Sequence, residues 1–239
     1  MKKGTLRQIL VIVGTLATLA VNVLANALPL NGQDQAEISD SFEVFFVPAG
    51  YVFSIWGLIY LALIAYTVYQ ALPAQRDSAL LDRVGWLYLG TCAANSAWLF
   101  AWHYFLFGLS LLVMVTLLVL LIAIYLTLGA GRRPPASTAN RWLVRVPFSI
   151  YLGWITVATV ANATSVFNYW GWGNGLDTAS AVWAAIMLVV ATVIAVLMSL
   201  RHGDVAYVAV IVWAFIGIAV KHSGTPLVSV TALAMAAIA

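Results

Sequence analysis

Uncharged apolar stretches long enough to cross a membrane constrain this chain most, and residues 147–165 form the clearest of them. The 19 residues PFSIYLGWITVATVANATS contain no charged side chain, which predicts a transmembrane helix. At about 100° per residue, one face of this helix is polar and aromatic. That face comprises Pro147, Tyr151, Trp154, Ala158, Ala161, Asn162 and Ser165. Because an unpaired amide or phenol in hydrocarbon costs several kcal/mol, we expect the face to point into a helix bundle.

The composition indicates an integral membrane protein. Of the 239 residues, 64% are hydrophobic and 8% are charged, and the mean hydropathy of +1.00 lies outside the range of soluble domains. A single cysteine, Cys92, rules out an internal disulfide and a thiolate metal cluster. His103, His202 and His222 are not at ligand spacing, so we expect no metal and no covalently bound cofactor. The cationic residues are spread over loops, which argues against nucleic acid as a partner.

Eight apolar segments follow one another along the chain. Their approximate ranges are 9–28, 49–70, 84–104, 108–128, 147–165, 179–200, 205–220 and 226–239. Residues 25–27 (Ala-Asn-Ala) are similar to a signal-peptidase site, but the first segment has the length of a full span, so we expect it to be retained as a helix. The last segment has 14 residues, about 21 Å of helix against about 30 Å of hydrocarbon, which favours a partial or embedded segment.

The loop charges predict the orientation of the protein in a bacterial inner or plasma membrane. With eight segments and a cytoplasmic N-terminus, ten Lys and Arg residues lie on the inner side and one, Lys221, lies on the outer side. The inner residues are Lys2, Lys3, Arg7, Arg76, Arg83, Arg132, Arg133, Arg141, Arg145 and Arg201. This bias follows the positive-inside rule. Residues 29–47 carry four carboxylates and no cation, and we expect them to form a solvated acidic loop outside.

Three other stretches have a distinctive composition. Residues 129–142, interrupted by Pro134 and Pro135, are predicted to form a linker. Residues 168–177 read as a glycine-rich turn whose aromatic residues lie at the membrane interface. The segment 108–128 is almost uniformly Leu, Val and Ile, so we expect it to face lipid.

The interior of the predicted spans excludes several classes of function. No Asp, Glu, Lys, Arg or His lies in the middle of a span, which argues against ion pumps, proton-coupled carriers and voltage sensors. The sequence contains no nucleophile paired with a base, no buried carboxylate pair and no phosphate-binding glycine loop. We therefore expect a protein that is not an enzyme and has no catalytic residues.

Aromatic residues deep within the spans are the remaining functional signal. Trp56, Trp98 and Trp154 lie too far from the segment ends for interfacial anchoring, and each shares a helix face with a tyrosine or an asparagine. Such faces suit a flat, largely apolar ligand such as a tetrapyrrole, a sterol or a carotenoid. The alternative is that these residues only pack helix against helix.

Three helix motifs resemble those of the tryptophan-rich sensory protein and translocator protein family (TspO/MBR). The motifs are Pro48-x-x-x-x-Phe53-x-x-Trp56-x-x-x-Tyr60, then Ala94-Asn95-Ser96-Ala97-Trp98-Leu99-Phe100, and then Pro147-Phe148 followed by Tyr151, Trp154, Ala158, Thr159 and Asn162. The resemblance covers about residues 6–168. It divides the chain into a five-helix core, residues 1–168, and additional C-terminal transmembrane helices, residues 169–239.

The resemblance implies an all-α transmembrane bundle, commonly a homodimer, that binds porphyrins and other tetrapyrroles in a sensory, regulatory or transport role. Carried over by position, the ligand-binding candidates are Trp56, Tyr60, Asn95, Trp98, Tyr151, Trp154 and Asn162. The additional helices favour a second hypothesis. In it the protein is a non-catalytic accessory or scaffold subunit of a larger membrane complex, such as a pigment-containing photosynthetic one.

Overall fold

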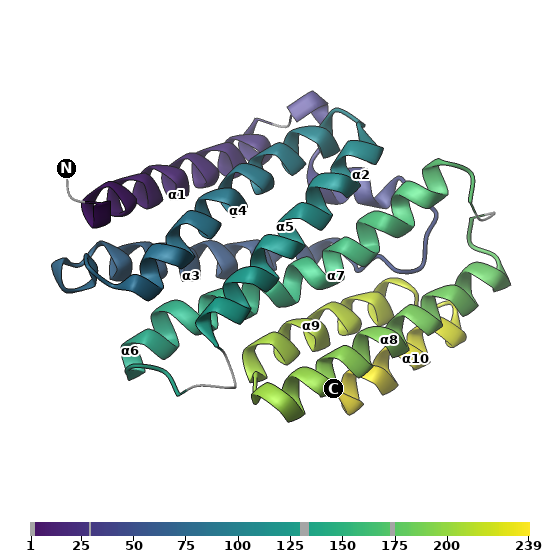
Figure 1. The fold of residues 1–239 in the computed structure, drawn as a ribbon. Coiled ribbons are helices and arrows are strands. Elements are labelled where there is room, and N and C mark those ends of the chain that lie inside the picture. The colour runs from purple at the N-terminus through teal and green to yellow at the C-terminus, as the bar shows by residue number, and fades with distance from the viewer. Residues whose placement is uncertain (1–2, 29, 130–133, 173–174) are drawn as a thin grey trace.

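The protein is a helical bundle. The computed structural model describes residues 3–28, 30–129, 134–172 and 175–239, and these residues contain no strand (Figure 1). Each of the eight predicted apolar segments is a helix, so the predicted polytopic helical fold is confirmed. The eight helices are α1 (Lys3–Ala27), α3 (Ile55–Ala71), α4 (Ala79–His103), α5 (Phe107–Leu128), α7 (Val146–Tyr169), α8 (Thr178–His202), α9 (Val205–Lys221) and α10 (Pro226–Ile238).

Five helical stretches among the described residues are long and apolar enough to cross a membrane. They are Gly4–Ala27, Gly50–Ala71, Phe107–Leu128, Thr138–Tyr169 and Thr178–His202. The helix α4 is not among these five. Its 25 residues are enough to cross a membrane, but its Asn, Tyr and Trp side chains lower its mean hydropathy. The helices α9 and α10 are apolar and shorter, with 17 and 13 residues. At about 1.5 Å per residue, α10 is about 20 Å long, which agrees with the short last segment predicted from the sequence.

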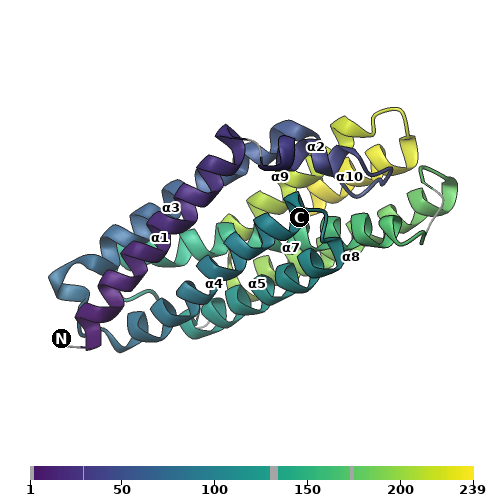
Figure 2. The same ribbon diagram turned by 90° about the horizontal axis from the view of Figure 1, so that it is seen from above.

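The helices pack in two groups that meet at α7. In the first group α4 lies between α1 and α5, and α7 contacts both α3 and α5 (Figures 1 and 2). In the second group α8, α9 and α10 contact one another, and α9 packs against α7. A Cβ at Gly153 of α7 would lie 3.0 Å from the Tyr207 carbonyl oxygen of α9, so glycine lets the two backbones approach closely.

The first helix is part of the bundle core. The Thr15 hydroxyl lies 2.8 Å from the Thr67 hydroxyl of α3 and 2.9 Å from the Tyr88 hydroxyl of α4. Two turns nearer its C-terminus, Asn22 donates to Asn95 of α4. These contacts join α1 to α3 and α4, and the retention of α1 stays a prediction.

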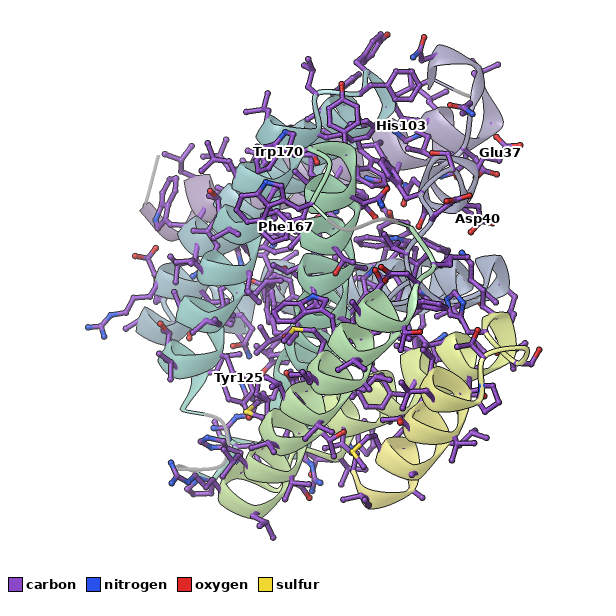
Figure 3. The ribbon with its side chains drawn as sticks, turned by 90° about the vertical axis from the view of Figure 1, so that its right-hand side faces the viewer. Glu37, Asp40, His103, Tyr125, Phe167 and Trp170 are labelled. Carbon is purple, nitrogen blue, oxygen red and sulfur yellow. The ribbon has the colours of Figure 1, made fainter. Side chains whose placement is uncertain are left out.

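Charged residues separate to the two ends of the bundle. The end that we call the basic end carries Arg76, Arg83, Arg141, Arg145 and Arg201 among its described residues. The opposite end, the acidic end, carries Asp34, Glu37, Asp40, Glu43 and Asp177 together with Lys221. Figure 3 views the molecule from the acidic end and shows Glu37 and Asp40 at its edge. Lys2, Arg132 and Arg133, which also entered the charge asymmetry, lie outside the described residues.

Residues 30–47 lie at the acidic end, as predicted, but the prediction that they form a solvated loop is wrong, and residue 29 lies outside the described residues. This segment contains the 3₁₀ turn η1 (Leu30–Gly32) and the short helix α2 (Gln35–Asp40), and the 3₁₀ helix η2 (Gly50–Ser54) follows it. Ile38, Phe45 and Phe46 are 1%, 4% and 0% exposed. The segment therefore folds back over the acidic end, with its carboxylates outward and its apolar side chains inward.

Three further predictions from composition need correction or limitation. The helix α5 does not simply face lipid, because Met114, Leu117 and Leu121 are buried against α4 and α7. Within the predicted linker, residues 134–137 are non-helical and residues 130–133 lie outside the described residues. The linker ends earlier than predicted, since α6 (Thr138–Asn140) and the π-helical turn η4 (Arg141–Arg145) lead directly into α7. In the predicted glycine-rich turn, residues 173–174 lie outside the described residues, while Tyr169, Trp170 and Trp172 are all exposed.

Candidate functional site

A small cavity lies beneath α2, where α3, α4, α5 and α7 meet. Its volume is about 40 Å³. The lining residues are Gln35, Ser39, Pro48, Phe53, Trp56, Trp98, Trp102, Met114, Trp154, Val157, Ala158, Ala161, Asn162 and Ser165. One buried water needs about 10–15 Å³ by the same kind of measure, so the cavity has room for a few waters and not for a tetrapyrrole.

Three tryptophans from three helices line this cavity. Trp56 of α3 and Trp154 of α7 meet edge to face, with ring centroids 6.2 Å apart and an interplanar angle of 80°. Trp98 of α4 stacks on Trp102 of the same helix, at 5.8 Å and 17°. The exposed fraction is 8% for Trp56, 7% for Trp98 and 3% for Trp154. They therefore face a shared centre rather than lipid.

Two of these indoles have an unpaired polar atom. Among the described residues, the buried Nε1 atoms of Trp98 and Trp154 have no hydrogen-bond partner, and neither has the Oε1 atom of Gln35, which lines the same cavity. A buried donor without an acceptor costs about 1–3 kcal/mol. Two N–H donors and one amide oxygen of residues that line a single cavity can thus bind a small polar group or the polar edge of a larger molecule.

The predicted amide residues make contacts between helices. Asn95 accepts from Asn22 of α1 at 2.7 Å and donates to the Tyr151 hydroxyl of α7 at 3.2 Å. Asn162 lines the cavity, but its amide nitrogen donates to Ser110 of α5 at 3.1 Å. Asn95 and Tyr151 therefore lie behind the cavity wall and tie α1, α4 and α7 together.

A second, more open cleft adjoins the cavity. Its volume is about 320 Å³, and Gln35, Phe53 and Trp56 line both spaces. The predicted site residue Tyr60 lies in this cleft, with its ring stacked on that of Trp56 at 5.5 Å and 21°. Displacement of the three shared side chains would join the cleft to the cavity.

The short helix α2 covers both spaces and has a well-formed start. Asp34 accepts from the backbone N–H groups of Ala36 and Glu37, and the Glu37 side chain accepts from the Asp34 backbone, which is a complete capping box. Its first residue, Gln35, is 5% exposed and lines both the cavity and the cleft. Sequence analysis missed Gln35 and Ser39 because they lie among carboxylates. The Asp34-x-x-Glu37 spacing, followed by Ile38, was the available signal for a helix start there.

The segment that follows α2 is held by α9. Asp40 pairs with Lys221. Three hydrogen bonds join the same two regions: His222 Nε2 to the Val47 carbonyl (3.3 Å), Ala49 N–H to the Gly217 carbonyl (3.2 Å), and Trp213 Nε1–H to the Val52 carbonyl (3.2 Å). The helix α9 and the residue that follows it therefore hold the cover of the cavity in place.

Comparison with known proteins gives one family. A family model described as TSPO-like protein matches residues 8–239, which includes α8, α9 and α10 as well as the preceding helices. No curated protein and no solved structure matches the chain. The division into residues 1–168 and 169–239 stays a prediction.

Proposed function

The chain belongs to the TSPO-like protein family and is an integral membrane protein, and from this premise we propose that it binds a flat, largely apolar ligand of the tetrapyrrole type beneath α2. The observation that carries the proposal is the pair of unpaired indole N–H groups of Trp98 and Trp154 at one cavity. A ligand with acceptor oxygens at its edge, such as a tetrapyrrole carboxylate, would pair these donors. A hydrocarbon carotenoid would leave both unpaired.

Binding of a molecule this size requires the cover to move. The cavity of about 40 Å³ and the adjoining cleft of about 320 Å³ share Gln35, Phe53 and Trp56. Ligand sites commonly measure about 300–1,000 Å³, so the joined space reaches the usual range once these side chains are displaced. The ligand would then stack on Trp56 and Tyr60 and present its polar edge to Trp98 and Trp154.

We propose binding in a sensory, regulatory or transport role, without catalysis. Every residue that lines the cavity is apolar, aromatic, or a neutral amide or hydroxyl residue. The one carboxylate residue of the adjoining cleft, Asp34, accepts from the backbone N–H groups that begin α2. Among the described residues, no group of three or more His, Cys, Asp or Glu could hold a metal ion.

We also propose that the N-terminus is cytoplasmic and that the membrane is a bacterial inner or plasma membrane. The clustering of arginines at the basic end, where α1 begins, supports this orientation.

Porphyrin titration tests the binding proposal. Protoporphyrin added to the detergent-solubilised protein should quench tryptophan fluorescence, and Trp154→Leu should weaken binding about tenfold or more, because it removes both a ring contact and an N–H donor. Trp86→Leu is the matched control, since Trp86 is 48% exposed on the surface of α4. Equal affinity of the wild type and Trp154→Leu contradicts the proposal.

A second candidate function is that of a non-catalytic scaffold subunit in a larger, pigment-containing membrane complex, or in a homodimer. Two observations favour the scaffold function. The cavity is small, and the indoles of Trp56, Trp98 and Trp154 pack against neighbouring rings as expected for contacts between helices. Purification in mild detergent, followed by mass spectrometry and an absorption spectrum, separates the two functions. Partner subunits in a fixed ratio support the scaffold, and a bound pigment with no other subunit supports the receptor.

A further inference from the structure

A groove at the basic end is separate from the aromatic site. Its volume is about 610 Å³, and it lies where residues 134–135, the turn η4 and the start of α9 approach one another. In Figure 1 the start of α6 and the turn between α8 and α9 lie near each other at the lower left. The groove is larger than the cavity and cleft at the acidic end, and the aromatic residues of that site do not line it.

Two arginines lie on the same wall of this groove. Arg141 and Arg145 are four residues apart in the π-helical turn η4, so both side chains leave the turn on the groove side. Arg145 donates through Nη2 to the Pro134 carbonyl at 3.1 Å, which fixes the chain before α6 against the turn. Arg141 is exposed, and its guanidinium lies 5.9 Å from the ring centre of Trp142.

The carboxylate of the groove already serves as an acceptor for protein donors. Asp204 Oδ2 accepts from the Ser149 hydroxyl at 2.6 Å, and Oδ1 accepts from the Tyr207 backbone N–H at 3.1 Å. Asp204 therefore caps the start of α9 and ties α9 to α7. Two guanidinium groups and one engaged carboxylate leave the groove with an excess of positive charge.

The remaining surroundings suit a ligand that is charged at one end and apolar at the other. Val205 and Ala209 of α9 line the groove and are exposed, so an apolar path leads from the arginines to the outer surface of α9. Trp142 is 59% exposed beside Arg141, as expected for an indole at the level of lipid headgroups. Basic pockets between transmembrane helices bind phosphate-bearing headgroups, and the guanidinium fork matches phosphate oxygens.

We propose that this groove recognises a phosphate ester, with Arg141 and Arg145 as its ligands, presented by an anionic phospholipid or by a free phosphate-bearing ion. The proposal does not depend on the aromatic site. It also goes beyond the positive-inside rule, because that rule explains why cations lie on one side of the membrane but not why two of them line one groove.

Native mass spectrometry of the detergent-solubilised full chain tests the proposal. Dioleoyl phosphatidylglycerol should bind about tenfold or more tightly than dioleoylglycerol, which has the same acyl chains and lacks the phosphate. Arg141→Gln should weaken phosphatidylglycerol binding about tenfold, and Arg141→Lys should weaken it less, because lysine keeps the charge and loses the fork. Arg141 is exposed, so these variants should retain the unfolding midpoint of the wild type.

Arg83→Gln is the matched control, because it removes an exposed arginine from the same end of the bundle outside the groove. Its affinity for phosphatidylglycerol should stay within about twofold of the wild type. Displacement of the lipid by millimolar inorganic phosphate identifies the phosphate alone as sufficient, and its failure to displace identifies the whole lipid as the ligand. Equal binding of the two lipids, or equal losses for Arg141→Gln and Arg83→Gln, overturns the proposal.

Discussion

The contact between α9 and the cover of the cavity can be tested with one methyl group. A Cβ at Gly217 would overlap Cγ2 of Val52 and lie 3.1 Å from Cβ of Pro48. Val52 is 0% exposed, and the Trp213 indole donates to its carbonyl, so η2 has little room to shift. We therefore expect Gly217→Ala to destabilise the fold.

The magnitude follows from two opposing terms. Overpacking costs about 1–3 kcal/mol, and the overlap with a fully buried side chain places this site near the upper limit. Alanine in a helix gains up to about 1 kcal/mol over glycine. The free energy of unfolding should thus fall by about 2 kcal/mol.

Gly57→Ala is the matched control for this substitution. Gly57 lies in α3, and a Cβ there would meet nothing within 4 Å, so only the helix-propensity gain of up to about 1 kcal/mol applies. Reversible unfolding by dodecyl sulfate in mixed micelles, followed by circular dichroism, should shift in opposite directions for the two variants. Adding Val52→Ala to Gly217→Ala should recover part of the loss. Unfolding of Gly217→Ala at or above the wild-type midpoint refutes the packing argument.

Other contacts lead to smaller expected effects. Replacement of Asn22 and Asn95 by alanine, singly and together, should give a coupling of about 0.6–1.7 kcal/mol in the same assay, and a coupling near zero contradicts their 2.7 Å bond. Burial lowers the pKa of His222, the hydrogen bond to the Val47 carbonyl opposes this, and the Lys221 charge lowers the pKa again. The net pKa is lowered, so the unfolded chain binds this proton more readily than the folded protein does. Wild-type stability should therefore fall below about pH 6.5 more steeply than that of His222→Gln and match its slope above pH 7, and parallel slopes throughout contradict this. Lys221→Gln breaks an exposed pair with Asp40 and should cost less than about 1 kcal/mol, so a larger loss indicates a tighter clamp.

The helices could be predicted from the sequence because each long apolar run has one stable form in lipid. Which face of each helix is buried could not be predicted in the same way. Residues 108–128 are so uniformly apolar that the sequence does not indicate which face is buried. Met114, Leu117 and Leu121 are buried because α4 and α7 pack against that side of α5. In the segment over the acidic end, Phe45 and Phe46 lie close to carboxylates in sequence but are buried, and the Phe45 ring packs edge to face against His222, directly after α9.

The sequence predicted the aromatic residues of the candidate site. Periodicity places Trp56, Trp98 and Trp154 on inward faces, because aromatic and polar residues recur together at helical spacing. The partner of Asn95 could not be predicted, since Asn22 belongs to a helix that carries no aromatic face. The volume of the cavity and the unpaired state of two indoles depend on how rings from separate helices fit together, which one sequence does not reveal.

The attachment of residues 40–52 to α9 has a consequence for biosynthesis. The bond from Trp213 to Val52 spans 161 residues, and the ion pair from Lys221 to Asp40 spans 181. At about 5–20 residues per second, a ribosome needs on the order of ten seconds or more to make the intervening chain. During that interval the segment has its contacts with α4 and α5, such as Phe42 against Trp102 and Phe107, but none of those with α9. The cover of the cavity is therefore completed only after α9 has been made.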